Sequence, residues 1–257
     1  MDKTIKLLND ELWYQEDLLR EMVNDDFYYN YLGQHALSSS SAKKLLESPY
    51  SYHKSLTEKQ TNVQPLRDGS LIHLMVLEPH RVEGLTFTKG TKASKVFKEA
   101  VAEFGQENVF TEIEYNFCSQ IAERVLQNKE IADMLRGAEF EIPAIDNYKG
   151  IPFRGKADIL KDGIVYDLKT TGDITKFRKS TEIYSYDLQC ALYLKLFDAK
   201  DFVFIVVDKK TLDLGVFNVS EEFINSGKRK LDLAIESYLE YLKQKKNIDQ
   251  HVIKGIL

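Results

Sequence analysis

The sequence predicts an α/β fold in which helices flank a mixed central β-sheet. Two alternating apolar runs, 153–160 and 164–168, flank an Asp162-Gly163 pair, which is typical of a hairpin because both turn positions can take a positive φ. A second apolar run, 202–207, is long enough for a buried strand, and helix-length segments precede and follow these strands. With 257 residues, 43% of them hydrophobic, the chain can bury one large core.

Composition excludes several classes of protein. A formal charge of -5 argues against a protein that binds DNA through a basic surface as a whole. Any DNA would be bound through local basic patches and a bound metal. Two cysteines, Cys118 and Cys190, are too few for a four-cysteine zinc site or an iron–sulfur cluster. No run approaches the roughly 18 apolar residues of a membrane span, and the first residues lack an apolar signal segment. We expect a cytoplasmic protein without membrane contact.

The first part of the chain, 1–37, predicts a helical segment of unknown role that packs on the body. A subunit contact is the alternative, favoured only if Trp13, Tyr28 and Tyr29 stay exposed. The main domain is expected to span 38–257. It opens with a short helix over 38–49, which serines cap and a Ser-Pro pair ends.

A nearly all-apolar helix then spans 68–79 around His73. A histidine in such a helix is more often a satisfied core residue than a metal ligand. A mostly helical insert follows at about 90–137, with a capping box at Thr111 to Glu114. Its basic stripe could follow a phosphate backbone, although a solvated helix face is the commoner explanation. The stripe consists of Lys89, Lys92, Lys95 and Lys98.

The central strands begin at 138–142, turn at 146–150 and return through Phe153. Glu139 and Glu141 are two residues apart in the first strand and therefore share one of its faces. After the hairpin, a helix is expected from about 181 to 197. The strands 202–207 and 214–219 form a second hairpin, and Ser220 caps a long amphipathic helix that runs to about 243.

The hairpin carries the strongest candidate for chemistry. Asp167 and Lys169 point to one face of their strand, and two carboxylates meet an ammonium if Asp158 faces the same side. Such buried charges cost several kcal/mol unless a divalent cation neutralises them. Hard oxygen ligands suit Mg²⁺ or Mn²⁺, and the neighbouring lysine suits phosphoryl chemistry. A surface salt-bridge cluster is the alternative, because Asp-x-Lys also occurs at Asp198 and Asp208.

These residues resemble the PD-(D/E)XK nuclease superfamily, whose signature is an acid on one strand and acid-x-Lys on the next. Here Ala157-Asp158 replaces Pro-Asp. A Gly69-x-x-x-His73 helix followed by Leu-Glu-Pro, and preceded by Ser-x-x-Lys-x-x-Leu-x-Ser-Pro, resembles the RecE-type exodeoxyribonucleases (exonuclease VIII) and related phage exonucleases. Gln189-x-x-x-Tyr193 matches a motif of the RecB-like branch. The resemblance covers roughly 38–230.

The resemblance implies a restriction-endonuclease-like core and a site for Mg²⁺, with Mn²⁺ as the alternative and no iron–sulfur cluster. Asp158 and Asp167 would hold the metal, and Lys169 would position the attacking water. The main-chain carbonyl of Leu168, the His73 side chain and an acid on the first central strand would complete the coordination, with Glu139 chosen over Glu141. Three residues are expected to bind the DNA strand, namely Gln189, Tyr193 and Tyr186.

Members of the resembling family digest linear double-stranded DNA from its ends. They commonly form homo-oligomeric rings and work with a single-strand annealing protein in phage recombination, which implies the same partners here. Two alternatives stay open. One is an endonuclease of the same fold, and the other is a non-catalytic DNA-binding or assembly protein that kept the fold. Intact acids and Lys169 favour an enzyme, because a binding module has no need for so costly a cluster.

Overall fold

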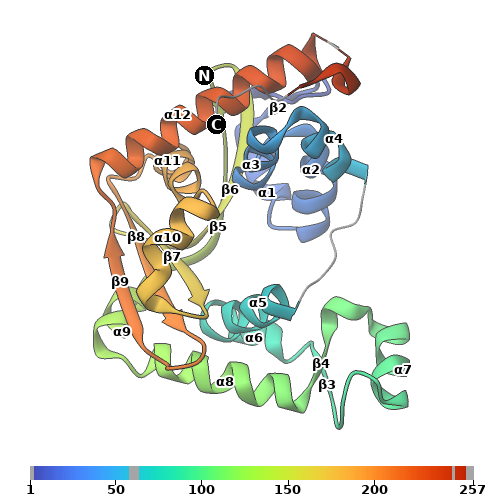
Figure 1. Cartoon of the computed structure of the whole chain (residues 1–257), viewed down its shortest axis with the longest axis vertical. Coiled ribbons are helices and arrows are strands. Elements are labelled where there is room, and N and C mark those ends of the chain that lie inside the picture. Colours follow the sequence, from blue (N-terminus) through green and yellow to red (C-terminus); the bar gives the residue numbers. More distant parts are fainter. Residues whose placement is uncertain (1–2, 58–63, 245–246, 253–257) are drawn as a thin grey trace.

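A five-stranded mixed sheet forms the centre of the computed structural model, which describes residues 3–57, 64–244 and 247–252 (Figure 1). The β7–β8 pair is parallel and the other three pairs are antiparallel. This mixed sheet, flanked by helices on both faces, confirms the predicted fold class. The strands follow one another in space as in the sequence: β5 (Glu139–Tyr148), β6 (Ile151–Lys161), β7 (Ile164–Thr171), β8 (Asp201–Asp208) and β9 (Leu214–Asn218).

The hairpin between β6 and β7 turns at the predicted pair. Asp162 and Gly163 have φ values of 52° and 74°, the positive values that a tight two-residue turn requires. The ladder between the two strands is short, because its last pair joins Ile159 to Tyr166. The strands therefore separate just before Asp158 and Asp167.

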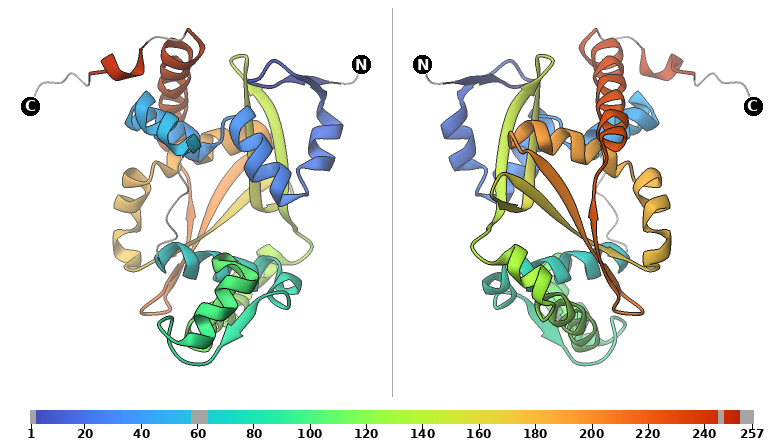
Figure 2. Two further views of the ribbon diagram at one scale, coloured as in Figure 1. Left: turned by 90° about the vertical axis from the view of Figure 1, so that its right-hand side faces the viewer. Right: turned by 90° about the vertical axis from the view of Figure 1, so that its left-hand side faces the viewer.

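Two apolar layers cover the sheet. Side chains of β8 show this division: Phe204 belongs to the cluster with α3, α11 and α12, whereas Ile205 belongs to the cluster with α5 and α8. Figure 2 shows α5 to α9 at one end of the sheet and α3, α4 and α12 at the other. These helices are α3 (Ser39–Glu47), α4 (Pro49–Thr57), α5 (Gln64–Leu77), α6 (Pro79–Val82), α7 (Lys95–Phe104), α8 (Glu112–Leu126), α9 (Lys129–Leu135), α10 (Phe177–Ile183), α11 (Tyr186–Leu196) and α12 (Glu221–Ser237), which a π-helix (Tyr238–Lys243) extends.

The first segment of the chain mixes strand and helix, where the sequence predicts helix alone. It packs around Ile145 of β5. Tyr28 is buried at 5% exposure whereas Tyr29 is 60% exposed, so the aromatic patch proposed for a subunit contact is only partly open. The segment comprises β1 (Thr4–Lys6), β2 (Leu12–Tyr14), α1 (Gln15–Glu21), the π-helix η1 (Phe27–Tyr31) and α2 (Leu32–His35).

The helical insert contains a parallel pair of short strands, β3 (Thr86–Thr88) and β4 (Val109–Thr111), that its sequence does not reveal. Its basic stripe is partly neutralised, because Lys92 lies 2.8 Å from Glu114 and Lys95 lies 3.6 Å from Glu99. Across the described ranges, the helices are all too short or too polar to cross a bilayer.

Candidate metal centre

The gap between β6 and β7 is held open by a side chain. The backbone N–H of Leu168 donates to Asp158 Oδ2 at 2.8 Å, in place of a carbonyl on the neighbouring strand. The carboxylate therefore accepts the hydrogen bond that a main-chain carbonyl of β6 would accept if the ladder continued past this point. Asp158 is fixed in position by this contact, with its remaining lone pairs directed away from the amide.

Three possible ligands from three different elements meet beside this gap. His73 of α5, Glu141 of β5 and Asp158 of β6 each offer one ligand atom, and these atoms lie within 4.8 Å of one another. We call these three residues the metal group. Glu141 reaches Asp158 because the β5–β6 register sets them opposite each other, between the Phe140–Ile159 and Ile142–Ala157 pairs.

Glu141 also has an unusual backbone. Its φ is 51°, in the left-handed region that a residue with a side chain seldom adopts, and the β5–β6 ladder lacks a pair at this position. Such local strain is concentrated at functional sites, where the surrounding structure holds it in place. Glu141 is therefore the acid of β5 that reaches His73 and Asp158, and a metal-binding role for either glutamate stays a prediction. Glu139 is exposed and pairs with Leu160 two residues farther along the strand, whereas Glu141 lies in the metal group.

His73 is a polar contact of the site and is not a satisfied core residue. Its Nδ1 lies 3.6 Å from Asp158 Oδ2, and its Nε2 lies 2.6 Å from the carbonyl oxygen of Leu168. With its proton on Nε2, the ring donates to the Leu168 carbonyl and presents the lone pair of Nδ1 toward the Asp158 carboxylate. The Leu168 carbonyl, a predicted ligand, thus also faces this part of the site.

The charge of the metal group calls for a cation. Burial raises the pKa of Glu141 to about 8, and repulsion by the Asp158 carboxylate acts in the same direction. Two acids in one half-buried place cannot both ionise cheaply unless a positive charge neutralises them. Carboxylate oxygens and an imidazole nitrogen together form a donor set that suits a divalent metal ion.

A second group lies on the neighbouring strand. The Asp167 side chain is fully buried, and its Oδ2 lies 2.5 Å from Lys169 Nζ. Its Oδ1 accepts a hydrogen bond from Gln189 Nε2 of α11 at 2.6 Å. Asp167 is therefore turned toward Lys169 and Gln189 and does not belong to the metal group. The structure brings the predicted Asp158, Asp167 and Lys169 to one end of the β6–β7 gap but divides the acids between two partners.

Opposing effects act on the two charges of this pair. Burial raises the pKa of Asp167, while the Lys169 ammonium acts in the opposite direction. Burial alone would lower the pKa of Lys169, but the carboxylates of Asp167 and Asp158 outweigh it and raise that pKa above its usual value. Lys169 is therefore a permanent cation at neutral pH.

The two predicted tyrosines have different surroundings. Tyr186 is half-buried, and Lys169 Nζ lies 5.0 Å from its ring centre. Tyr193 is only 7% exposed and covers Gly155 of β6, where an added Cβ would lie 2.9 Å from the ring. The structure thus places Tyr186 beside the candidate site and Tyr193 in the core beneath it.

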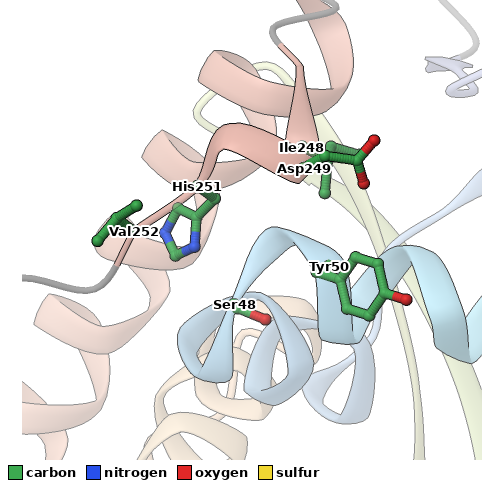
Figure 3. Close-up of a pocket in the computed structure, with 6 residues that line it drawn as sticks. All are labelled: Ser48, Tyr50, Ile248, Asp249, His251 and Val252. Carbon is green, nitrogen blue, oxygen red and sulfur yellow. The ribbon is translucent and has the colours of Figure 1, made fainter.

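The hollow in Figure 3 lies elsewhere. It has a volume of about 540 Å³ and separates the C-terminal segment from the junction of α3 and α4. It contains no member of the metal group and no residue of the Asp167–Lys169 pair. Its lining consists of Ser48, Tyr50, Ile248, Asp249, His251 and Val252.

The raised pKa of Glu141 predicts a pH-dependent stability of the metal-free protein. Between the pKa of an unfolded glutamate and about 8, the folded state binds the extra proton, so stability must fall as the pH rises. We expect a loss of about 3.5 kcal/mol in the free energy of unfolding between about pH 5 and about pH 8, measured by urea denaturation in EDTA. Glu141→Gln should remove most of this loss, whereas Glu139→Gln should retain it. If the stability of wild type and of Glu141→Gln changed equally with pH, Glu141 could not be the group with the raised pKa.

Comparison with known proteins agrees with the geometry. Residues 38–250 match the model of a family described as a PDDEXK-like domain of unknown function (DUF3799). No curated protein matches the chain.

Among solved structures, a protein from Eubacterium rectale described as a "Putative exonuclease" has 15% sequence identity and a TM-score of 0.67, with 91% of this chain and 95% of that chain covered. This likeness extends over nearly the whole fold. A phage-related exonuclease from Haemophilus somnus 129PT has 14% identity and a TM-score of 0.35, with 82% of this chain and 96% of that chain covered.

Proposed function

The chain belongs to the family of PDDEXK-like domains, and on that premise we propose that it is a metal-dependent nuclease that hydrolyses phosphodiester bonds of DNA. One observation carries the proposal. Where β6 and β7 separate, the metal group lies beside a buried carboxylate paired with a permanently charged lysine. In-line attack on a phosphate requires carboxylates that bind a metal ion and a fixed ammonium beside them.

We infer that Asp158, Glu141 and His73 would hold a Mg²⁺ ion, or Mn²⁺ in its place, with the Leu168 carbonyl close enough to contribute. Once bound, such an ion lowers the pKa of a water molecule and offsets the charge of the phosphate. The raised pKa of Glu141 is the feature of this chain that fits the ion, because a bound cation would offset both the cost of burying the carboxylate and its repulsion by Asp158.

The remaining residues act without changing their charge. Lys169 orients the attacking water and stabilises the negative charge that develops on the phosphate oxygens. Asp167 fixes the lysine through its 2.5 Å contact, and Gln189 fixes Asp167 in turn. In this proposal Asp167 is the residue that aligns Lys169, and any bond from Asp167 to a metal would require the pair to rearrange.

For substrate and partners, the proposal follows the resemblance to the RecE-type exodeoxyribonucleases. The substrate is linear double-stranded DNA that is digested from its ends. The setting is phage-type recombination in the cytoplasm, with a single-strand annealing protein as partner and a homo-oligomeric ring as the working form. Tyr186 contacts the DNA strand from beside Lys169, and Tyr193 supports β6 from within.

The experiment compares linear and covalently closed circular duplex DNA, each incubated with Mg²⁺ or with EDTA. The proposal predicts loss of linear DNA only, and only with Mg²⁺. Cutting of circles would identify an endonuclease of the same fold. Binding of either DNA without metal-dependent cutting would favour the non-catalytic alternative and contradict the proposal.

A further inference from the structure

A second lysine shares an aromatic ring with Lys169. Lys43 of α3 has its Nζ 5.3 Å from the ring centre of Tyr186, and Lys169 Nζ lies 5.0 Å from the same ring centre. Two ammonium groups from distant parts of the sequence therefore gather at one side chain next to the candidate site. Like charges repel each other, so the position of Lys43 near Lys169 does not stabilise the fold and requires another explanation.

Lys43 is also poorly compensated. Within residues 3–57, 64–244 and 247–252, no carboxylate lies within ion-pair distance of it, whereas the next residue, Lys44, lies 3.0 Å from Glu47. Burial lowers the pKa of Lys43 to about 8, the charge of Lys169 acts in the same direction, and the more distant carboxylates of Asp167 and Asp187 offset these effects only in part. A half-buried cation whose pKa is lowered, and which forms no ion pair with a described carboxylate, marks a place where an anion would be stabilising.

The helix that carries Lys43 is firmly attached to the sheet. Leu37, just before α3, donates to the Pro152 carbonyl at 2.9 Å and accepts from the Arg154 N–H at 2.7 Å. Ser38 caps the helix, and Leu45 anchors it in the core. Lys43 is thus presented from a rigid element at a fixed place relative to β6, as a residue that positions a ligand must be.

The surface next to the two lysines is aromatic. Tyr184 stacks on Tyr186 with ring centres 5.8 Å apart and planes 30° apart, and Tyr184 is 57% exposed. Cations that track a phosphate backbone beside aromatic faces that stack on bases are the two components of single-strand binding surfaces. The cluster of Lys43, Lys169, Tyr184 and Tyr186 combines both components at one end of the candidate site.

We propose that Lys43 binds a non-bridging oxygen of the DNA phosphate next to the one that is cleaved, and so sets the register of the strand. The proposal rests on the proposed nuclease function, and Lys43 is a positioning residue in it. Its ammonium would form a charge-assisted hydrogen bond to the phosphate, which replaces the acid that the folded protein does not provide. The adjacent base would lie against Tyr184.

The test compares Lys43→Met with Lys44→Met in the full chain. Affinity for a short DNA duplex with a single-stranded overhang is measured with Ca²⁺, and hydrolysis is measured with Mg²⁺. We expect Lys43→Met to raise the dissociation constant and KM about tenfold, to change kcat less, and to reduce the salt dependence of binding by about one ion. Lys44→Met should behave as wild type, and Lys43→Arg should restore most of the affinity.

Stability in the absence of DNA separates this role from a structural one. Removal of an uncompensated cation should leave the melting temperature of Lys43→Met unchanged or higher, although DNA binding weakens. Two results for Lys43→Met would overturn the inference. One is a DNA affinity equal to that of Lys44→Met, and the other is a melting temperature and a kcat that both fall below the wild-type values. If the wild type binds DNA but does not cut it, the proposed function fails, while the binding comparison still decides the role of Lys43.

Discussion

Replacement of Lys169 with alanine should reduce metal-dependent DNA cleavage by about a thousandfold or more, while the folded state persists. Among the residues that the structure describes, Lys169 supplies the one ammonium that forms an ion pair with the buried Asp167, at 2.5 Å, and its pKa is raised, so it is charged throughout the working pH range. The variant loses the charge that faces the phosphate in the transition state. It also leaves Asp167 buried with Gln189 as its partner, and the aspartate can then take up a proton to avoid an unpaired charge.

The matched control is Lys210→Ala. Lys210 ends another Asp-x-Lys sequence, but it is exposed, and its backbone N–H donates to Asp208. Cleavage should be unchanged in this variant. The measurement is the initial rate of release of nucleotides from linear DNA with Mg²⁺, with circular dichroism to verify the fold. A Lys169→Ala enzyme within about tenfold of wild type would contradict the assignment of this lysine.

Replacement of Gly227 with alanine should destabilise the fold by about 3 kcal/mol or more. Gly227 is buried in α12 where that helix crosses α11, and an added Cβ would lie 1.9 Å from the carbonyl oxygen of Asp187. Backbone atoms cannot move aside as a flexible side chain can. The two helices would have to separate, and the contacts from Ser226 and Lys230 to the Asp187 carboxylate, both shorter than 3 Å, would be lost.

Gly69→Ala provides the control, since Gly69 also lies within a helix. Its added Cβ would meet Thr170 Oγ1 at an ordinary 3.7 Å, so we expect stability to stay equal or to rise by about 0.5 to 1 kcal/mol. Urea denaturation of both variants measures the difference. Because α11 carries Gln189, the Gly227 variant should also lose activity. Wild-type stability in Gly227→Ala would show that α11 and α12 pack less closely than described.

Much of the candidate site could be predicted from the sequence, because its signals are local. The Asp162-Gly163 turn dictates the hairpin, and the hairpin brings Asp158 near Asp167 and Lys169. The predicted membership of the PD-(D/E)XK superfamily is confirmed by the family model over 38–250, whereas the RecE type stays a prediction. Strands and helices with clear periodicity were likewise predictable, since each buries one continuous face.

Other features depend on register or on distant contacts. Glu139 and Glu141 share a face, so alternation cannot choose between them; the register opposite Asp158 and the left-handed φ of Glu141 do. Lys43 and Tyr186 are far apart in the sequence and meet only in the folded chain, so the Ser-x-x-Lys motif that contains Lys43 does not by itself reveal this contact. The three-residue strands of the first segment and of the insert are too short to show a period.

Where β6 and β7 separate, we propose a site for a divalent cation, on which the nuclease function depends. The direct measurement is the anomalous scattering of Mn²⁺ in crystals of the full chain grown with that ion. We predict a peak within coordination distance of Asp158, Glu141 and His73, and its disappearance in crystals of Glu141→Gln but not of Glu139→Gln. A fully occupied Mn²⁺ elsewhere, with none at these three residues, would contradict the account.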